Sequence, residues 1–336
     1  MTVTLADIHA AAQVVRGAAD ATPLVPSPFM TARSGYDFLL KLENMQPIGA
    51  FKLRGAMNAV AAIGPDVAGV TCVSTGNHGR GVAYAARARG IRAVICMSEL
   101  VPAAKVEGIR ALGAEICITG RSQDEAQAEV DRLVAEEGLV ELSPFDDRHV
   151  IAGQGTIGLE LLTVRPDLHT ILVPLSGGGL AAGVACAAKA IKPDIRVVGV
   201  SMDRGAAMYE SLRAGRPVEV AEMPSLADSL GGGIGLENRY GFVMCRALLD
   251  DVLLVSEAEI RHAMQALYYE DRIVAEGGSV VGLAAVLTGK ITLAGPTAAL
   301  ITGRNPDMAM FTRVVTGQDV VLGDMTVPGR TYAGAA

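Results

Sequence analysis

Short apolar runs alternate with helical segments over residues 69–143, and this alternation limits the possible folds more than any other feature. The first pair is a strand at 70–73 and a helix from about Arg80 to Arg89, which Gly90 closes. The other expected elements are strands at 92–97, 115–119 and 139–142, a helix between Pro102 and Gly113, and a helix that Ser122 caps and that runs towards Glu137. Strands and helices at this spacing predict βαβ units and a parallel sheet.

The second half of the chain repeats this pattern. We expect strands at 170–175, 196–200, 252–255 and 298–301, with helices between them and irregular connections near Gly215 and Gly231-Gly232-Gly233. The predicted fold class is α/β, with two open twisted-sheet lobes and a cleft between them. Open sheets bind ligands beyond the carboxyl ends of their strands, so the turns that follow the strands are the candidate site segments.

The composition narrows the range of partners and compartments. Half of the 336 residues are apolar, 19% are charged and the formal net charge is −7, so we expect a sizeable core and neither nucleic acid nor an anionic membrane as partner. The five cysteines form no Cys-x-x-Cys pair, which favours buried, reduced thiols in a cytoplasmic protein. The uncharged stretch 170–188 contains Pro174 and three consecutive glycines, and it fits strand, loop and helix better than a membrane span.

Lys52 lies between apolar neighbours in Gly49-Ala50-Phe51-Lys52-Leu53-Arg54-Gly55. A lone lysine of this kind usually extends from the start of an amphipathic helix into solvent. The other interpretation is a lysine that forms a Schiff base, which requires partial desolvation so that the amine stays nucleophilic. Phe51 can supply the apolar wall, but this segment alone favours the solvated lysine.

The segment Ser74-Thr75-Gly76-Asn77-His78-Gly79 follows an expected strand and precedes a helix. Such a turn presents backbone N–H groups and a helix N-terminus, which favour a carboxylate or a phosphate. Asn77 can bond a ring hydroxyl and Thr75 a substrate carboxylate, although an ordinary turn explains the segment equally well. His78 is more simply explained as a structural hydrogen-bonding group than as a general base.

A second anion site is predicted at Ser176-Gly177-Gly178-Gly179-Leu180, again between a strand and a helix. Three glycines let backbone amides approach an anion closely, and the dipole of the following helix favours a phosphate dianion. The alternative is a dinucleotide site, because Gly177, Gly179 and Gly183 come near the Rossmann pattern and Asp203 follows the next strand. The position of the loop in the middle of the chain favours the phosphate interpretation.

Thr302-Gly303-Arg304-Asn305 follows the last expected strand. The Thr302 hydroxyl can face a ring nitrogen and the Arg304 guanidinium can bind a carboxylate as a planar fork. For this segment alone, a plain strand-to-helix turn with Thr302 as a local cap is the better explanation. Metal-binding and serine-hydrolase motifs are missing from the sequence, which has scattered histidines, no His-Glu-x-x-His and no Gly-x-Ser-x-Gly.

Taken together, these segments resemble the fold type II pyridoxal-phosphate enzymes, the family of threonine dehydratase, serine racemase and cysteine synthase. The order matches: the lysine segment, the Ser74–Gly79 turn, the glycine loop and the late Thr302. Ser143-Pro144-Phe145-Asp146-Asp147 and Ile151-Ala152-Gly153-Gln154-Gly155-Thr156 are similar to segments of threonine dehydratases. The resemblance extends over 8–317 and implies pyridoxal 5'-phosphate as the cofactor.

The resemblance implies a role for each matching residue. Lys52 binds the cofactor covalently and removes the substrate's Cα proton, and Thr75 lies on the opposite face of the cofactor. The implied substrate-binding residues are Ser74, Thr75, Gly76, Asn77, His78 and Arg304, and the implied cofactor contacts are Phe51, Lys52, Asn77, Ser176, Gly177, Gly178, Gly179, Leu180, Glu276 and Thr302. The implied domains are a large cofactor-binding domain (1–58 and 146–336) and a small domain (59–145), in a homodimer.

The implied activity is that of a lyase, in which a β-hydroxy α-amino acid loses water and then ammonia. Racemases of this family carry serine where Thr75 stands, so Thr75 favours elimination. Ser201, Gly205 and Ala207 stand at the metal-site positions of serine racemase, where its acidic ligands are replaced, so we expect no structural Mg²⁺. The alternatives are a serine or threonine racemase, a β-replacement enzyme, and a non-catalytic ligand-binding regulator, which would need neither Lys52 nor the glycine loop.

Within the family, two segments are most similar to the dehydratases of hydroxyectoine utilisation: 227–235, Ala-Asp-Ser-Leu-Gly-Gly-Gly-Ile-Gly, and 302–305, where the usual dehydratase has Ser-Gly-Gly-Asn. Opening of the hydroxyectoine ring leaves a hydroxyl β to an α-amino acid carbon, which is the arrangement that β-elimination needs. The resemblance therefore implies amino-acid catabolism, with Arg304 fitting a substrate larger or more polar than threonine.

Overall fold

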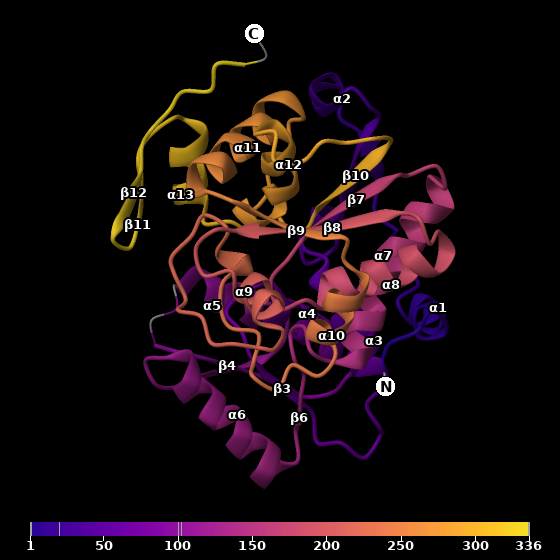
Figure 1. Cartoon of the computed structure of the whole chain (residues 1–336). Coiled ribbons are helices and arrows are strands. Elements are labelled where there is room, and N and C mark those ends of the chain that lie inside the picture. Colours follow the sequence, from indigo (N-terminus) through magenta and orange to yellow (C-terminus); the bar gives the residue numbers. More distant parts are fainter. Residues whose placement is uncertain (1, 20, 100, 102, 335–336) are drawn as a thin grey trace.

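Two sheets organise the chain, and the computed structural model describes residues 2–19, 21–99, 101 and 103–334. The strands are β1 (Leu24–Pro26), β2 (Phe38–Leu42), β3 (Val70–Val73), β4 (Ala93–Met97), β5 (Glu115–Ile118), β6 (Val140–Glu141), β7 (Thr170–Pro174), β8 (Arg196–Met202), β9 (Asp251–Val255), β10 (Thr297–Ile301), β11 (Val320–Leu322) and β12 (Met325–Val327). The larger sheet has the order β1-β2-β10-β7-β8-β9 and the smaller one β5-β4-β3-β6 (Figure 1). β1 runs antiparallel to β2, and the other neighbours in these two sheets run parallel.

Helices pack on both faces of each sheet. They are α1 (Leu5–Val14), α2 (Pro28–Ser34), α3 (Lys52–Ala61), α4 (Asn77–Arg89), α5 (Ala103–Arg110), α6 (Gln123–Glu137), α7 (Arg148–Val164), α8 (Gly179–Ile191), α9 (Ala207–Ala214), α10 (Gly241–Leu248), α11 (Glu257–Glu270), α12 (Val281–Leu287) and α13 (Met308–Val315), with 3₁₀ turns at Glu43–Met45, Asp228–Leu230 and Gly277–Ser279. One core of the larger sheet contains residues of α2, α11, α12 and α13, and the other contains residues of α1, α7, α8 and α10. The smaller sheet packs against α3, α4 and α5 on one face and α6 on the other.

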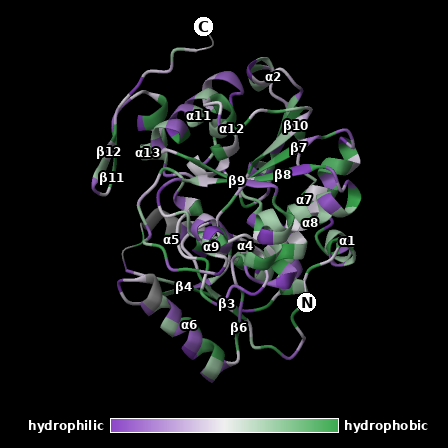
Figure 2. Ribbon diagram, in the orientation of Figure 1, coloured by the Kyte–Doolittle hydropathy of each residue, from purple (hydrophilic) through white to green (hydrophobic). Residues whose placement is uncertain are grey.

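Burial on both faces explains why central strands such as β7 and β10 are continuous apolar runs, where green predominates in Figure 2. Helix α6 shows the opposite pattern, because it covers the sheet with Ala126, Val130 and Leu133 and turns charged side chains to solvent. None of the helices in the described ranges combines the length and the apolar content that a membrane crossing requires.

The structure confirms the α/β fold class and contains each predicted strand, with boundary shifts of a few residues. Helix α4 begins at Asn77 instead of near Arg80, because Gly76 already serves as its N-cap. Ser122 caps α6 in a capping box, as expected. The proposed helix start at Pro102 lies outside the described residues. Three features were not predicted from the sequence: β1, β2 and the antiparallel pair of β11 and β12.

Helix α7 fixes α3 relative to α8 through glycine contacts. A Cβ added to Gly153 of α7 would lie 2.6 Å from the Arg54 carbonyl oxygen of α3, and a Cβ on Gly183 of α8 would clash with the Ile151 carbonyl of α7. These glycines therefore let the backbones approach more closely than any other residue would allow. Because α3 begins with Lys52 and α8 begins in the glycine loop, this packing sets the relative positions of two candidate site segments.

Candidate active site

The end of β10 pairs with the segment that leads into α3. The Phe51 N–H donates to the Thr302 carbonyl at 3.0 Å, and the Arg304 N–H donates to the Gly49 carbonyl at 2.9 Å. Gly49 permits this turn because its φ of +78° lies in the left-handed region that favours glycine. Lys52, the first residue of α3, is thereby held beside the turn that follows β10.

The Lys52 amine is engaged by the protein itself. Its Nζ donates to the Pro144 carbonyl oxygen at 2.6 Å and lies 5.4 Å from the centre of the Phe51 ring. Burial lowers the pKa of Lys52 to about 8. The amine therefore bonds the Pro144 carbonyl instead of extending into solvent, and a useful fraction of it is neutral and nucleophilic near neutral pH.

Asn77, the first residue of α4, joins Glu276 and Asn305 in one hydrogen-bonded cluster. Asn77 Nδ2 donates to the two carboxylate oxygens of Glu276 at 2.9 and 3.1 Å, and Asn305 Nδ2 donates to Asn77 Oδ1 at 2.7 Å. The Asn305 backbone N–H donates to Glu276 Oε1 at 2.9 Å. Burial raises the pKa of Glu276, although these donors oppose the shift. The cluster fixes the Asn77 amide, whose second N–H is suited to a ligand hydroxyl.

The turn between β3 and α4 is held by Ser74. Its Oγ accepts hydrogen bonds from the backbone N–H groups of Gly76 at 3.3 Å and Gly79 at 3.0 Å. The half-buried Thr75 lies between Ser74 and Gly76, just before α4 begins at Asn77. First-turn amides of a helix lack intrahelical partners, so this turn can receive a carboxylate.

His78 uses its ring for a structural contact. Its Nε2 lies 2.7 Å from the Leu142 carbonyl oxygen, and the side chain is buried. Burial, with a smaller contribution from the charge of Lys52, lowers the pKa of His78 to about 3. The ring is therefore neutral, and the backbone N–H of His78, rather than its ring, is the group that can reach a substrate carboxylate.

The Thr302 hydroxyl is buried and lies 2.9 Å from the Ser279 hydroxyl. Ser279 Oγ also accepts the Gly303 N–H at 2.9 Å. Ser279 was not nominated from the sequence, because it lies outside the motifs that follow the strands. The pair presents a neutral hydroxyl at the end of β10, which suits a ring nitrogen that stays less protonated than it would beside a carboxylate.

The glycine loop Ser176–Leu180 joins β7 to α8. Gly178 is the N-cap of α8 with a φ of +96°, a conformation that favours glycine. The Phe145 ring covers the position that a Gly177 side chain would occupy, and a Cβ on Gly179 would lie 2.5 Å from the Phe145 carbonyl oxygen. The loop therefore presents bare backbone amides at the N-terminus of a 13-residue helix, which is an anion-binding geometry.

These groups fit a phosphorylated ring aldehyde. The set provides an amine of lowered pKa for the aldehyde, an amide N–H for a ring hydroxyl, a neutral hydroxyl for a ring nitrogen and a glycine cradle for a phosphate. Arg304 engages the site through its backbone, whereas its side chain is exposed. Among the described residues, no group of three or more His, Cys, Asp or Glu side chains is placed to hold a metal ion.

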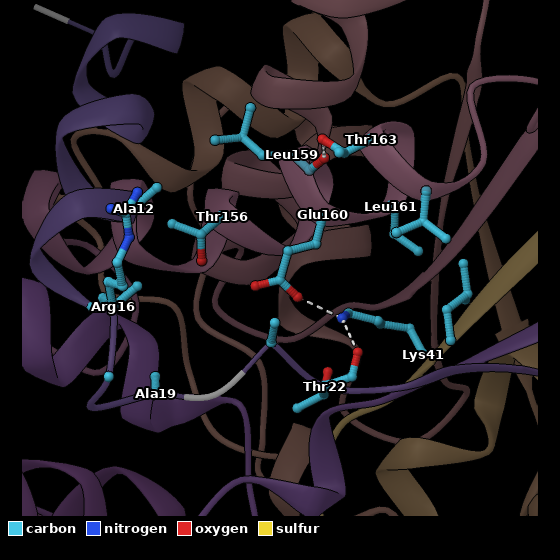
Figure 3. Close-up of a pocket in the computed structure, with 15 residues that line it drawn as sticks. Ala12, Arg16, Ala19, Thr22, Lys41, Thr156, Leu159, Glu160, Leu161 and Thr163 are labelled. Atoms are coloured by element: carbon cyan, nitrogen blue, oxygen red, sulfur yellow. Dashed lines mark hydrogen bonds and ion pairs between the residues drawn. The ribbon is translucent and has the colours of Figure 1, made fainter.

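A cavity of about 500 Å³ lies apart from Lys52, between the end of α1, residues 16–19 and 21–24, β2 and α7 (Figure 3). Lys41 Nζ contacts Glu160 Oε2 at 2.5 Å and donates to the Thr22 carbonyl oxygen at 2.6 Å. Deeper in the protein, Arg54 contacts Glu160 at 2.6 Å and Glu43 at 2.8 Å. This charge network anchors α3 through Arg54, two residues after Lys52.

Known proteins resemble the chain over most of its length. The family model described as pyridoxal-phosphate dependent enzyme matches residues 15–303. A putative threonine dehydratase of Sinorhizobium fredii is 54% identical over 299 residues, covering 88% of this chain and 90% of the relative. The L-threonine ammonia-lyase of Thermotoga maritima is 38% identical over 316 residues, covering 93% and 78%. Maize serine racemase has a similar structure, with a TM-score of 0.88, 32% identity and coverage of 93% and 97%. The chain is therefore a pyridoxal-phosphate-dependent enzyme, a member of that family and a homologue of the threonine dehydratases.

Proposed function

We propose that the chain is a lyase that dehydrates and deaminates a β-hydroxy α-amino acid, as threonine and serine dehydratases do. The observation that carries the proposal is the environment of Lys52, whose amine has a pKa of about 8 and bonds the segment that covers the glycine loop. The sequence identity of 54% with a putative threonine dehydratase and of 38% with an L-threonine ammonia-lyase supports this class of substrate.

Each side chain has one task in this proposal. When bound, pyridoxal phosphate supplies an electron sink for the negative charge that develops at the substrate's Cα. Lys52 would hold the cofactor, and its Nζ would take the Cα proton of the bound substrate. Asn77 would bond the ring hydroxyl, Thr302 would serve the ring nitrogen, and the Ser74–His78 turn would bind the substrate carboxylate. Loss of the β-hydroxyl as water leaves an enamine, which hydrolyses to a keto acid and ammonia.

A substrate screen tests this proposal directly. Purified holoenzyme is expected to release one ammonia and one keto acid for each β-hydroxy amino acid consumed, with threonine and serine in the first panel. Chiral analysis of the remaining substrate runs in parallel, because the similarity to maize serine racemase favours a racemase as the second candidate. Formation of the opposite enantiomer without ammonia would replace the lyase proposal with that alternative. Because Thr75 stands where racemases of the family carry serine, we expect ammonia release instead of racemisation.

We propose further that the natural substrate derives from hydroxyectoine and that Arg304 contributes to its selection. The Arg304 side chain is exposed, and in the described part of the chain its guanidinium has no side-chain partner, so it is free to meet a polar substrate. An Arg304→Gly variant is expected to lose activity on the hydroxyectoine-derived amino acid relative to threonine. Equal changes for both substrates would contradict this role.

Domain division and assembly are also proposals. The larger sheet takes its strands from 24–42 and 170–301, and the smaller sheet takes its strands from 70–141. This membership supports a large domain of residues 1–58 and 146–336 and a small domain of residues 59–145. As the resemblance implies, we propose a cytoplasmic homodimer, and a light-scattering mass equal to one chain would contradict the dimer.

Uptake of pyridoxal phosphate by the apo-enzyme is expected to depend steeply on pH. Only the neutral Lys52 amine attacks the aldehyde, so the rate constant should rise about tenfold per pH unit below the lowered pKa and level off about one unit above it. Stopped-flow absorbance at a series of pH values measures this profile. A rate that keeps rising to the ordinary lysine value of 10.5 would show that burial does not control the amine.

A further inference from the structure

The segment Ser143–Asp147 connects β6 to α7 and touches separate parts of the candidate site. The Pro144 carbonyl accepts the Lys52 amine at 2.6 Å. Phe145 covers the glycine loop, with its ring against Gly177. A segment that contacts both the lysine and the loop is placed to relate their positions, and the next residue along it makes contacts that the proposed reaction leaves unexplained.

Asp146 binds three consecutive backbone N–H groups. Its Oδ2 accepts from Arg239 at 2.6 Å, and its Oδ1 accepts from Tyr240 at 2.8 Å and from Gly241 at 3.0 Å. These amides lead into α10, which begins at Gly241. The carboxylate thus fills a nest of amides at a helix start, which is an arrangement that holds an anion firmly. The contacts join two segments that lie more than 90 residues apart in sequence.

The start of α10 and the residues just before it contact the carbonyl oxygens of the glycine loop. Asn238 Nδ2 donates to the Gly177 carbonyl at 3.4 Å, and Cys245 Sγ donates to the Gly178 carbonyl at 3.5 Å. Asn238 Oδ1 in turn accepts the Phe242 N–H at 2.7 Å, which ties this contact to the helix. The Gly177 and Gly178 carbonyls are therefore bonded to Asn238, just before α10, and to Cys245 within α10, so these two carbonyls are already engaged on the α10 side of the loop.

The loop consequently lies between Phe145 on one side and α10 on the other, and Asp146 joins these two sides. We propose that Asp146 is a positioning residue that holds the amides of Ser176–Leu180 in the geometry that binds the cofactor phosphate. This inference rests on the proposed role of that loop as the phosphate site. Without the Asp146 bonds, α10 and Phe145 can separate, and the loop loses the two supports that keep its amides convergent.

The test compares pyridoxal phosphate with pyridoxal, which lacks the phosphate. The ratio is the dissociation constant of pyridoxal divided by that of pyridoxal phosphate, both measured by absorbance titration of the apo-enzyme. It reports how much the phosphate contributes to binding. Asp146→Ala is expected to weaken pyridoxal phosphate about 10-fold to 100-fold, the size typical of losing a residue that orients ligand-contacting groups, while pyridoxal changes little. General loss of folding would weaken both ligands alike and leave the ratio unchanged.

Asp147 provides the matched control. Its carboxylate caps α7 by accepting from His149 N–H at 2.7 Å and Val150 N–H at 2.9 Å, and within the described ranges it bonds neither α10 nor the glycine loop. Asp147→Ala is expected to lower the melting temperature, because a helix cap is lost, and to keep the ratio. An equal drop in the ratio for both variants would overturn the assignment to Asp146.

Two further variants test the inference if Asp146→Ala does not fold and test whether the glycine loop is the phosphate site. Asp146→Asn keeps an acceptor for Tyr240 and Gly241 and loses the one for Arg239, so a smaller drop in the ratio is expected even if the alanine variant does not fold. An unchanged or increased ratio in a folded Asp146 variant overturns the inference, and an increase would mean that the carboxylate mainly repels the phosphate. Gly179→Ala, whose Cβ would lie 2.5 Å from the Phe145 carbonyl, disturbs the loop itself. If it also keeps the ratio, the phosphate site is not this loop and the proposed function fails at that point.

Discussion

Replacing Lys52 by alanine is expected to lower kcat/KM for the best β-hydroxy amino acid by about 10⁴-fold or more. The variant loses the amine that holds the cofactor and the base that takes the Cα proton, and burial has adjusted the pKa of that amine to about 8. The visible absorbance band of the covalently bound cofactor should disappear as well. Steady-state assays of ammonia release and an absorbance spectrum measure the two effects on the same sample.

Lys189→Ala is the control for this prediction. Lys189 lies on α8, the helix that begins in the glycine loop, and it forms a surface ion pair with Asp250 at 2.7 Å. Such a pair contributes little, so less than about a twofold change in kcat/KM is expected. A Lys52→Ala enzyme that keeps its visible band would show that the cofactor is attached elsewhere, and the proposed function would fall with it.

The strands could be predicted wherever burial on both faces made them apolar, and β2 shows where this signal ends. Phe38–Leu42 is buried at all five positions, yet it includes Lys41, which interrupts the apolar run. Lys41 is tolerated there because its Nζ bonds Glu160, a residue 119 positions later in the chain. A charge that is neutralised at this distance gives no local sequence signal, so the position of β2 required the three-dimensional fold.

The candidate site divides in the same way. Lys52, Asn77 and Thr302 stand in short motifs at strand or helix ends, and local turn chemistry was enough to nominate them. Pro144 and Asn305 also stand in motifs of the sequence, but nothing in those motifs indicated that the Pro144 carbonyl would bond Lys52 or that the Asn305 amide would orient Asn77. A backbone carbonyl leaves no trace in residue types, and Asn305 meets Asn77 across 228 residues. Sequence motifs therefore identified the groups suited to the cofactor, whereas the residues that orient them emerged from packing.

Replacing Arg54 by methionine is expected to lower the free energy of unfolding by about 3–5 kcal/mol. Arg54 is fully buried and bonds both Glu43, which is also fully buried, and Glu160. Figure 3 draws Glu160 among the residues that line the cavity. Burial acts to raise the pKa of Glu43, but the Arg54 guanidinium, together with Lys41 and the Thr22 hydroxyl, outweighs it and holds that pKa below its usual range. Removing the guanidinium leaves the Glu43 carboxylate without its main partner in a low-dielectric interior. Urea unfolding at pH 7 measures the loss.

Arg92→Met separates this effect from the general loss of an arginine. Arg92 pairs with Glu115 and Glu137 on the surface, with side-chain exposures of 37%, 58% and 35%. Exposed pairs of this kind are screened by solvent, so a loss below about 1 kcal/mol is expected. Equal losses in the two arginine variants would contradict the argument that burial makes the Arg54 network critical.

The pH dependence of the Arg54→Met loss identifies its cause. In the parent, Glu43 has a depressed pKa, so its contribution is present above the unfolded pKa and is lost as the pH falls. In the variant, Lys41 and the Thr22 hydroxyl still oppose burial, but the largest opposing group is gone, so we expect the sign to reverse. The folded state then binds the proton more tightly than the unfolded state, and stability rises as the pH falls from 7 towards 5. The difference in the free energy of unfolding between variant and parent should therefore shrink over this interval.

A double variant that carries Glu43→Leu and Arg54→Met should recover part of the loss at pH 7, because apolar side chains can replace a buried ion pair once both charges are gone.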